Sequence, residues 1–306
     1  MPSKNILLAD DISSSSRHGK KRSYQLRNLA AHLSVAMKAQ LHFLYVEDIP
    51  EHLRKREKLL SLEKRNPKLI DKLKKKLEKI SSNYKIHIES GAPVQKILDC
   101  MQELDAELIV IATRGKKGVS KLFLGSVAEE VIRNSSCPVV VLGPQVLNVG
   151  LGTPDRKTRI LLLTDLQASS KPAEDFTKKI AKQLHAQVTV FHSVGDPIMH
   201  IKNFYYQSAV TNYSLDEDLA AMKTWARQEL TKRSEQFKKE GLSVRTRFIV
   251  DEHAVEKDLK RELVEDYDLV VMGTHSRNKI ISSFIGSTAR KTCLMSPAPV
   301  AIVRSK

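Results

Sequence analysis

Cysteine is scarce in this 306-residue chain, and its three cysteines are far apart. Cys100, Cys137 and Cys293 form no CxxC pair. An odd, scattered set is typical neither of a disulfide framework nor of a zinc site, and it fits a reducing compartment. We therefore expect free thiols, with Cys137, which directly precedes an apolar run, acting as a small buried hydrophobe.

Long apolar runs are absent as well. No uninterrupted run approaches the roughly 18 to 20 residues that a membrane-spanning helix needs. The first residues, Met1 to Asn5, lead directly into a strand-like run without the apolar h-region of a signal peptide. We expect a cytoplasmic protein that has no membrane partner.

Acidic residues are outnumbered, with 35 Asp and Glu against 51 Lys and Arg and a net charge of +16. Such a charge permits attraction to nucleic acid, anionic lipid or polyanionic metabolites. Many lysines fall within residues 51–82, where an apolar stripe predicts an amphipathic helix that begins near Pro67. No aromatic residues are interleaved for stacking on bases, so a solvated basic face is the simpler interpretation. A docking surface is the alternative, and nucleic-acid binding is not expected.

Apolar runs and helical periodicity alternate along the first half of the chain. Strands are expected at residues 6–9, 39–46, 85–89, 108–111 and 137–142, and helices at about residues 24–38, 67–80 and 94–101 and after Gly125. Proline at position 138, at the start of the fifth strand, predicts an edge position for that strand.

The same order returns in the second half. Residues 160–165 match the first strand and its terminal aspartate, and residues 186–191 match residues 39–44. A capping box from Ser214 to Glu217 predicts the start of a long helix, with Trp225 on its apolar stripe and Gly241 at its end. Finding the order twice indicates a duplication.

We predict two tandem domains, residues 1–145 and 159–306, joined by a linker over residues 146–158. Strands that alternate with helices are typical of α/β domains, and right-handed crossovers place helices on both faces of a parallel sheet. Each domain is therefore expected to be a doubly wound, Rossmann-like, five-stranded parallel sheet. Ligands of such sheets bind beyond the carboxyl ends of the strands, where the strand order reverses.

A glycine-bearing loop follows the fourth strand of each half. Ala112 and Gly125 are 13 positions apart, as are Gly273 and Gly286. Backbone N–H groups at a helix start attract anions, glycine allows a phosphate to approach closely, and the first loop adds three cations, Arg114, Lys116 and Lys117. The alternative is purely structural, since Ser126 with Glu129 forms a capping box and Ser287 is able to cap in the same way.

Other signatures of phosphate or catalytic chemistry are missing. The chain has no GxxxxGK[ST] and no GxGxxG after a strand. His275 lies in the second loop, but no Ser/His/Asp arrangement can be assembled around it. Asp10 and Asp11 could hold Mg²⁺ together with substrate phosphates, yet Asp165 has no acidic residue before it. We predict no catalytic residue and no dedicated metal site.

These features resemble the universal stress protein family in its tandem form. The family's signature is G-x2-G-x9-G-[ST] after the fourth strand, with an aspartate closing the first strand. For the ATP-binding branch, the resemblance implies that the signature residues hold phosphates and ribose, that the aspartate meets the nucleoside, and that backbone after the second strand contacts adenine. The matching positions are Asp11, Val46, Ala112, Gly115, Gly125, Ser126 and Val127, then Asp165, Val194, Gly273, Ser276, Gly286, Ser287 and Thr288.

Each half departs from the signature once. Ala112 replaces the first glycine of half one, and Ser276 replaces the second glycine of half two. Glu252 also stands where half one has Gly91. Alanine would strain the backbone if its position requires a positive φ. The first site, with its three cations, is expected to bind its ligand more tightly than the second.

The resemblance implies a stress-response sensor or adaptor that binds ATP or a related adenine nucleotide, with Mg²⁺ as an accompanying ion and at most slow hydrolysis. It also implies pairing through the last strands, Pro138–Leu142 and Pro299–Val303, as an intramolecular pseudo-dimer or a homodimer. The alternative is a scaffold with degenerate pockets that works through protein partners or a non-nucleotide ligand.

Overall fold

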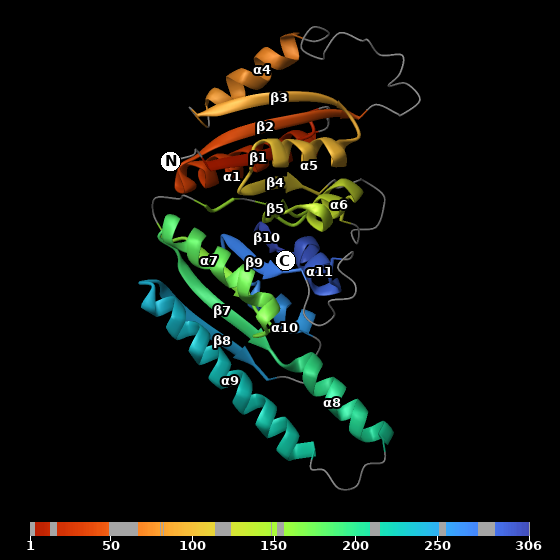
Figure 1. The fold of residues 1–306 in the computed structure, drawn as a ribbon, viewed down its shortest axis with the longest axis vertical. Coiled ribbons are helices and arrows are strands. Elements are labelled where there is room, and N and C mark those ends of the chain that lie inside the picture. Colours follow the sequence, from red (N-terminus) through yellow and green to blue (C-terminus); the bar gives the residue numbers. More distant parts are fainter. Residues whose placement is uncertain are drawn as a thin grey trace.

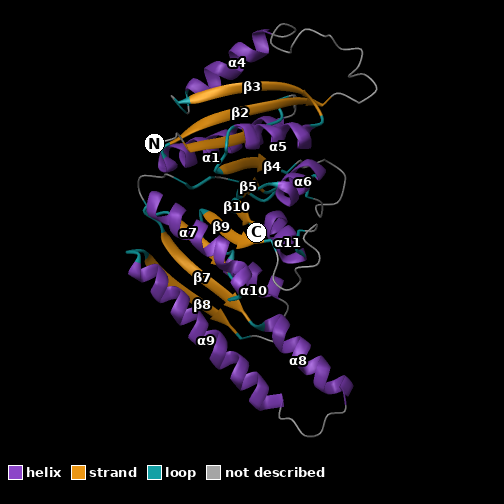
Figure 2. Cartoon of the chain, in the orientation of Figure 1, coloured by secondary structure: helices purple, strands orange, loops and turns teal. Residues whose placement is uncertain are grey.

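The computed structural model describes residues 4–12, 17–48, 67–79, 81, 83–113, 124–147, 149–151, 156–208, 215–250, 255–274 and 285–305. Ten strands form a single sheet in the order β3-β2-β1-β4-β5-β10-β9-β6-β7-β8. Figure 2 shows helices on both sides of it. The strands β1 to β5 and their helices are called half one below, and β6 to β10 with theirs are called half two.

Half one alternates strands and helices. Its elements are β1 (Lys4–Ala9), α1 (Arg17–Met37), β2 (Ala39–Asp48), α4 (Pro67–Glu78), β3 (Tyr84–Gly91), α5 (Pro93–Glu103), β4 (Leu108–Ala112), α6 (Ser126–Asn134) and β5 (Val139–Leu142). The predicted start of a helix at Pro67 is confirmed. Strand order reverses between β1 and β4, which are parallel neighbours although β2 and β3 lie between them in the chain.

Half two repeats this arrangement with longer helices beside its third strand. Its elements are β6 (Arg159–Leu163), a 3-10 turn (Ala168–Ser170), α7 (Lys171–Gln183), β7 (Gln187–Ser193), α8 (Gly195–Ser208), α9 (Leu215–Lys239), β8 (Ser243–Ile249), α10 (Val255–Glu262), β9 (Leu269–Gly273), α11 (Ser287–Met295) and β10 (Val300–Val303). The expectation of doubly wound α/β halves is confirmed, and strand order reverses here between β6 and β9.

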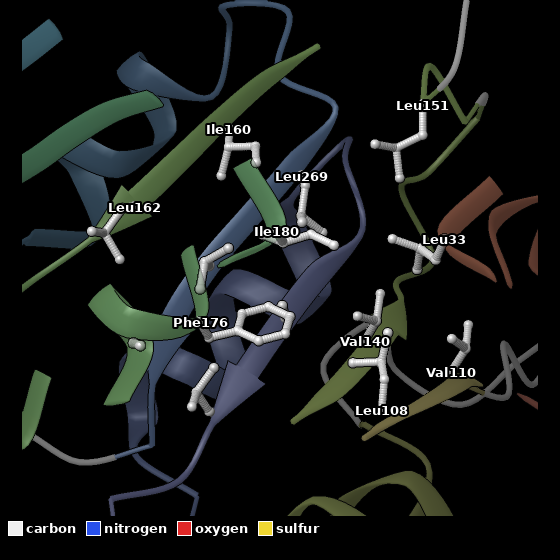
Figure 3. Packing of buried hydrophobic residues seen from close by; sticks show 14 of the residues in the cluster. Leu33, Leu108, Val110, Val140, Leu151, Ile160, Leu162, Phe176, Ile180 and Leu269 are labelled. Carbon is white, nitrogen blue, oxygen red and sulfur yellow. The ribbon is translucent and has the colours of Figure 1, made fainter. Parts of the chain in front are cut away.

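Two layers of helices cover the sheet, each over its own apolar cluster. One cluster joins α1, α4, α7, α8 and α9 to one face, and the other joins α5, α6, α10 and α11 to the opposite face. Figure 3 shows the first cluster crossing from half one, with Leu33 and Val140, to half two, with Phe176 and Ile180. The apolar core is therefore continuous through the junction between the halves.

The junction is a pair of strands. β5 and β10 run antiparallel, with Val140 opposite Ala301, and they lie in the middle of the sheet (Figure 1). The last strands thus pair within one chain, as expected. The expected edge position of β5 is wrong, because Pro138 precedes the first ladder residue and β10 covers the side of β5 that β4 leaves open.

Two expectations about the long helix α9 have different outcomes. Gly241 has φ +80 just after the helix, as its role as a terminator requires. Trp225 was placed on the apolar stripe, but it is 41% exposed while Ala226 is fully buried. Each residue advances about 100° around a helix, so one position separates the buried stripe from its border. The predicted cap at Ser214 lies outside the described residues.

The three cysteines are free, and two of them are buried. Burial raises the pKa of Cys100 to about 11 and that of Cys293 to about 12. Cys137 was expected to be buried, but it is only half-buried at the end of the turn before β5. Among the described helices, none is long and apolar enough to cross a bilayer.

Candidate functional site

The predicted site residues of each half gather at the carboxyl edge of the sheet. In half one, Asp11 follows β1, Val46 lies near the end of β2, Ala112 ends β4 and Gly125 precedes α6. All four are half-buried. The loop with Gly115, Arg114, Lys116 and Lys117 lies outside the described residues, as do Ser276 and Glu252 of half two.

Helices α6 and α11 begin in the same way. Gly125 and Gly286 are the residues before the first turn, with φ −56 and −54, and neither helix has a side-chain cap. The alternative that Ser126 and Ser287 cap these helices is wrong, because each serine is already the first helical residue and is exposed. The first N–H groups of a helix lack intrahelical partners and carry partial positive charge. Both starts are therefore suited to an anion.

Close approach, rather than a positive φ, explains Gly286. Its N–H donates to the carbonyl oxygen of Thr274 at 3.1 Å, which ties the start of α11 to the end of β9. A Cβ on Gly286 would lie 2.8 Å from that oxygen, closer than ordinary packing permits. Residues 274 and 286 are thus held together at the base of the loop between them.

The corresponding first position of the signature, Gly273 in half two and Ala112 in half one, does not require glycine. Neither residue has a positive φ, and a Cβ on Gly273 would meet no atom closer than 3.8 Å. Ala112 ends β4 as a regular strand residue paired with Leu142. The strain considered for Ala112 therefore does not arise.

The aspartate of half two is engaged by its own connection. Asp165 Oδ1 accepts hydrogen bonds from the N–H of Gln167 at 2.9 Å and from the hydroxyl of Ser170 at 2.5 Å. The hydroxyl of Ser169 donates to Oδ2 at 3.4 Å. These bonds shape the turn from β6 into α7, so a ligand's hydroxyl would have to compete with three protein donors.

Asp10 of half one belongs to a buried ion pair. Its Oδ2 accepts from Arg27 Nη2 at 2.6 Å, with both side chains less than one-tenth exposed, and Ser23 donates to Oδ1 at 2.8 Å. Arg27 lies on the inner face of α1, where sequence periodicity predicts only apolar residues. Asp10 therefore holds α1 on the sheet, and a Mg²⁺ ion at Asp10 and Asp11, the possibility raised by the sequence, would have to compete with Arg27.

Arg22 precedes Arg27 on α1, and its side chain reaches the end of β5. It donates to the carbonyl oxygen of Leu142 at 2.8 Å and to the hydroxyl of Thr113. Burial lowers its pKa to about 10, and the nearby Asp10 opposes that shift. Sequence reasoning missed both arginines. The available signal was a pair of cations that interrupts the apolar face of a helix beside a strand-end aspartate.

Half two replaces that ion pair by a different one. Glu174 of α7 is fully buried, accepts from Thr164 at 3.4 Å, and lies 3.1 Å from Arg233 of α9. Burial raises the pKa of Glu174, while Arg233 lowers it. The first helix of half one is thus tied to the end of β1 by an ion pair, whereas the first helix of half two forms its ion pair with the neighbouring helix α9.

The end of β7 differs chemically from the end of β2. Ala9 is opposite Leu44 and Leu163 is opposite Phe191, so Ser193, rather than Val194, corresponds to Val46. Val194 is buried in the apolar cluster.

The Ser193 hydroxyl takes part in a buried polar contact. It donates to Asp258 Oδ2 at 2.6 Å and accepts from the N–H of Gly195 at 3.3 Å. Asp258 is fully buried, and its Oδ1 has no hydrogen-bond partner among the described residues. Half one has an apolar valine at the corresponding position. The ends of β2 and β7, where the family resemblance places the adenine base, therefore differ in polarity.

No group of three or more metal-binding side chains (His, Cys, Asp or Glu) occurs within the described ranges. Together, the fold and the two strand-end sites define a class of protein: two doubly wound α/β units in tandem, each with an anion-compatible helix start at its switch point.

Comparisons with known proteins identify the family to which this class of protein belongs. The model of the universal stress protein family matches residues 2–143 and again residues 157–304. The chain therefore belongs to the universal stress protein family and carries two copies of its domain.

Curated relatives match over shorter stretches. A universal stress protein of Methanocaldococcus jannaschii is 43% identical over 72 residues, which is 22% of this chain and 42% of that protein. Universal stress protein E of Escherichia coli is 40% identical over 58 residues, 19% of this chain and 18% of that protein. The matched stretches thus span less than half of either relative.

Solved structures match the whole chain in fold. A universal stress protein from Archaeoglobus fulgidus superposes with a TM-score of 0.66 at 18% identity, covering 99% of both chains. A structure from Pseudomonas aeruginosa gives a TM-score of 0.62 at 15% identity over 99% of this chain and 93% of that one. At these identities the likeness concerns the fold.

Proposed function

We propose that the chain binds ATP or a related adenine nucleotide at the carboxyl edge of its sheet and acts in the cytoplasm as a stress-response sensor or adaptor. The observation that carries this proposal is the pair of uncapped helix starts, α6 and α11, each beside the switch point of its half. Phosphate is the natural ligand of such a start, because several unpaired N–H groups and the helix dipole act on it together.

We place the stronger site in half one. The Asp165 carboxylate of half two already accepts three hydrogen bonds, and Ser193 with Asp258 makes the end of β7 polar. In half one, Val46 offers an apolar edge for a purine, and Ala112 fits without strain. Half two is then a weaker site or a scaffold element that supports the first.

Two matched substitutions test this assignment. Ser126 and Ser287 are exposed first-turn residues, so aspartate at either position is compatible with the helix dipole and with folding. The same carboxylate repels a phosphate at that helix start. We expect Ser126→Asp to remove most of the nucleotide-dependent stabilisation, and Ser287→Asp to leave most of it.

The measurement is the melting temperature in ATP, AMP and Mg²⁺-ATP, together with isothermal titration calorimetry. A ligand that binds only the folded state stabilises it by RT ln(1 + [L]/Kd), so the shift should grow with concentration and then become logarithmic. If millimolar nucleotide changes neither the melting temperature nor the heat of titration, the proposal is overturned in favour of a non-nucleotide scaffold. Mass spectrometry of denatured protein from cells shows whether nucleotide accompanies it.

A further inference from the structure

The two halves meet through residues that correspond to each other in the duplication. Val140 and Ala301 occupy the same position of β5 and β10, and they lie directly opposite each other. On either side the register is antiparallel, with Val141 opposite Val300 and Val139 opposite Ile302. A local pseudo-twofold axis therefore passes between residues 140 and 301. In a true twofold interface, a residue at such an axis faces its own copy.

A second corresponding pair lies across the same axis and has opposite charges. Glu129 is the fourth residue of α6 and Arg290 is the fourth residue of α11. The Arg290 guanidinium forms an ion pair with Glu129 Oε1, with the two side chains 38% and 15% exposed. Figure 1 shows these helices side by side at the junction. Pairing two copies of half one would place Glu129 against Glu129, and pairing two copies of half two would place Arg290 against Arg290.

A third corresponding pair differs in shape. Gly143 follows β5, and a Cβ there would lie 2.1 Å from the carbonyl oxygen of Cys293 in α11. Arg304 occupies the same position after β10, and its guanidinium donates to the carbonyl oxygen of Ser135 after α6 at 3.4 Å. A residue with a side chain could not take the place of Gly143 against α11. Half two therefore fits half one, but it does not fit a second copy of itself.

We propose that the interface between the halves is specific for unlike halves: each half recognises the other and rejects a copy of itself. The Glu129–Arg290 pair supplies the charge complementarity and the Gly143 position supplies the steric discrimination. The occupant of β5 is then β10 of the same chain, which the covalent link keeps at high effective concentration. Any further assembly of chains must use a surface other than these two strands.

Charge reversal measures the cost of like pairs in the intact chain. Glu129→Arg creates an Arg–Arg contact, Arg290→Glu creates a Glu–Glu contact, and the double variant restores an opposite pair with its polarity exchanged. We expect each single variant to raise the unfolding equilibrium constant about tenfold, because the pair is partly buried and like charges repel at short range. The double variant should recover part of that loss, since Arg133, 3.4 Å from Glu129 Oε1, also pairs with Glu129 and would face an arginine there. Glu130→Arg is the matched control, since Glu130 is the exposed neighbour on the same helix.

Denaturant unfolding followed by circular dichroism gives these constants, and no nucleotide is needed, so the outcome is independent of the proposed function. A double variant as unstable as the worse single variant would overturn the charge argument. So would an effect of Glu130→Arg equal to that of Glu129→Arg.

A second substitution pair tests the steric part. Gly143→Ala should destabilise the chain because its methyl group meets backbone, whereas Arg304→Gly should be tolerated with a small loss. Equal effects of the two changes would overturn the steric discrimination.

Discussion

The imidazole rings of His42 and His87 stack in half one, with His42 Nδ1 2.9 Å from His87 Nε2. His42 Nε2 lies 3.2 Å from Asn5 Oδ1, and the His42 side chain is 2% exposed. One ring nitrogen of the histidine pair donates and the other accepts, so the accepting ring must be neutral and protonation of both rings breaks the contact. Half two has Thr189 at the position of His42, as its pairing with Leu161 shows.

Stability of the chain should therefore fall in mild acid. Burial first, then His87 and Lys85, lower the pKa of His42 to about 4 from an ordinary value near 6.5. The pKa of His87 is lowered by burial, with Glu89 and Glu103 opposing and Lys85 adding. Between pH 6.5 and 4 the unfolded chain binds more protons than the folded one, so the free energy of unfolding decreases as pH falls through that window.

We expect a loss on the order of 2 kcal/mol across this window, since one pKa unit corresponds to about 1.4 kcal/mol. His42→Thr, which introduces the residue of half two, should flatten the slope of stability against pH while also lowering stability at pH 7.5. Urea unfolding at several pH values measures both. An unchanged slope in the variant would show that other groups carry the dependence.

Glycine is required at only one of the two signature positions that half two retains. Gly286→Ala places a methyl group 2.8 Å from the Thr274 oxygen and should cost about 1 to 3 kcal/mol, because backbone must move. Gly273→Ala has room and should cost less than about 1 kcal/mol, as the natural Ala112 of half one indicates. Thermal unfolding of the two variants tests the contrast, and equal losses would refute it.

Arg27 should be worth far more to stability than a surface lysine of equal charge. Arg27→Met leaves Asp10 buried without its cation and should cost about 3 to 5 kcal/mol. Lys179→Met removes a pair of similar length, 2.8 Å to Glu107, but at the surface, and should cost at most about 1 kcal/mol. Denaturant midpoints of the two variants compare them directly. A loss for Arg27→Met no larger than for Lys179→Met would mean that Asp10 finds another partner.

The contact between Ser193 and Asp258 should behave as a unit. Ser193→Val removes the hydrogen bond that Ser193 donates to a fully buried carboxylate and should cost about 1 to 3 kcal/mol. Ser193→Val with Asp258→Leu removes both polar partners and should recover much of that loss. Chemical denaturation of single and double variants forms a double-mutant cycle. Additive losses would show that the two side chains act independently.

Local features of the sequence predicted much of the fold. Apolar runs placed most of the strands, and the glycines at 125 and 286 marked where α6 and α11 begin, because both signals depend on neighbouring residues. The error at Trp225 was a shift by one position around a helix, and the error at Ser126 was a shift by one position along it. Hydrophobic periodicity does not resolve shifts of one position, because it gives only the approximate face and the approximate ends of a helix.

The sequence by itself determined that the chain is a duplication of a doubly wound α/β unit with a glycine-marked helix start in each copy. Only the tertiary structure decided that Asp10 binds Arg27, that Asp165 is held by Ser170, and that Glu129 meets Arg290. The physical reason is distance along the chain: Glu129 and Arg290 are 161 positions apart, and only the β5–β10 pairing brings them together. Side-chain partners of that kind depend on packing, which the order of strands and helices does not contain.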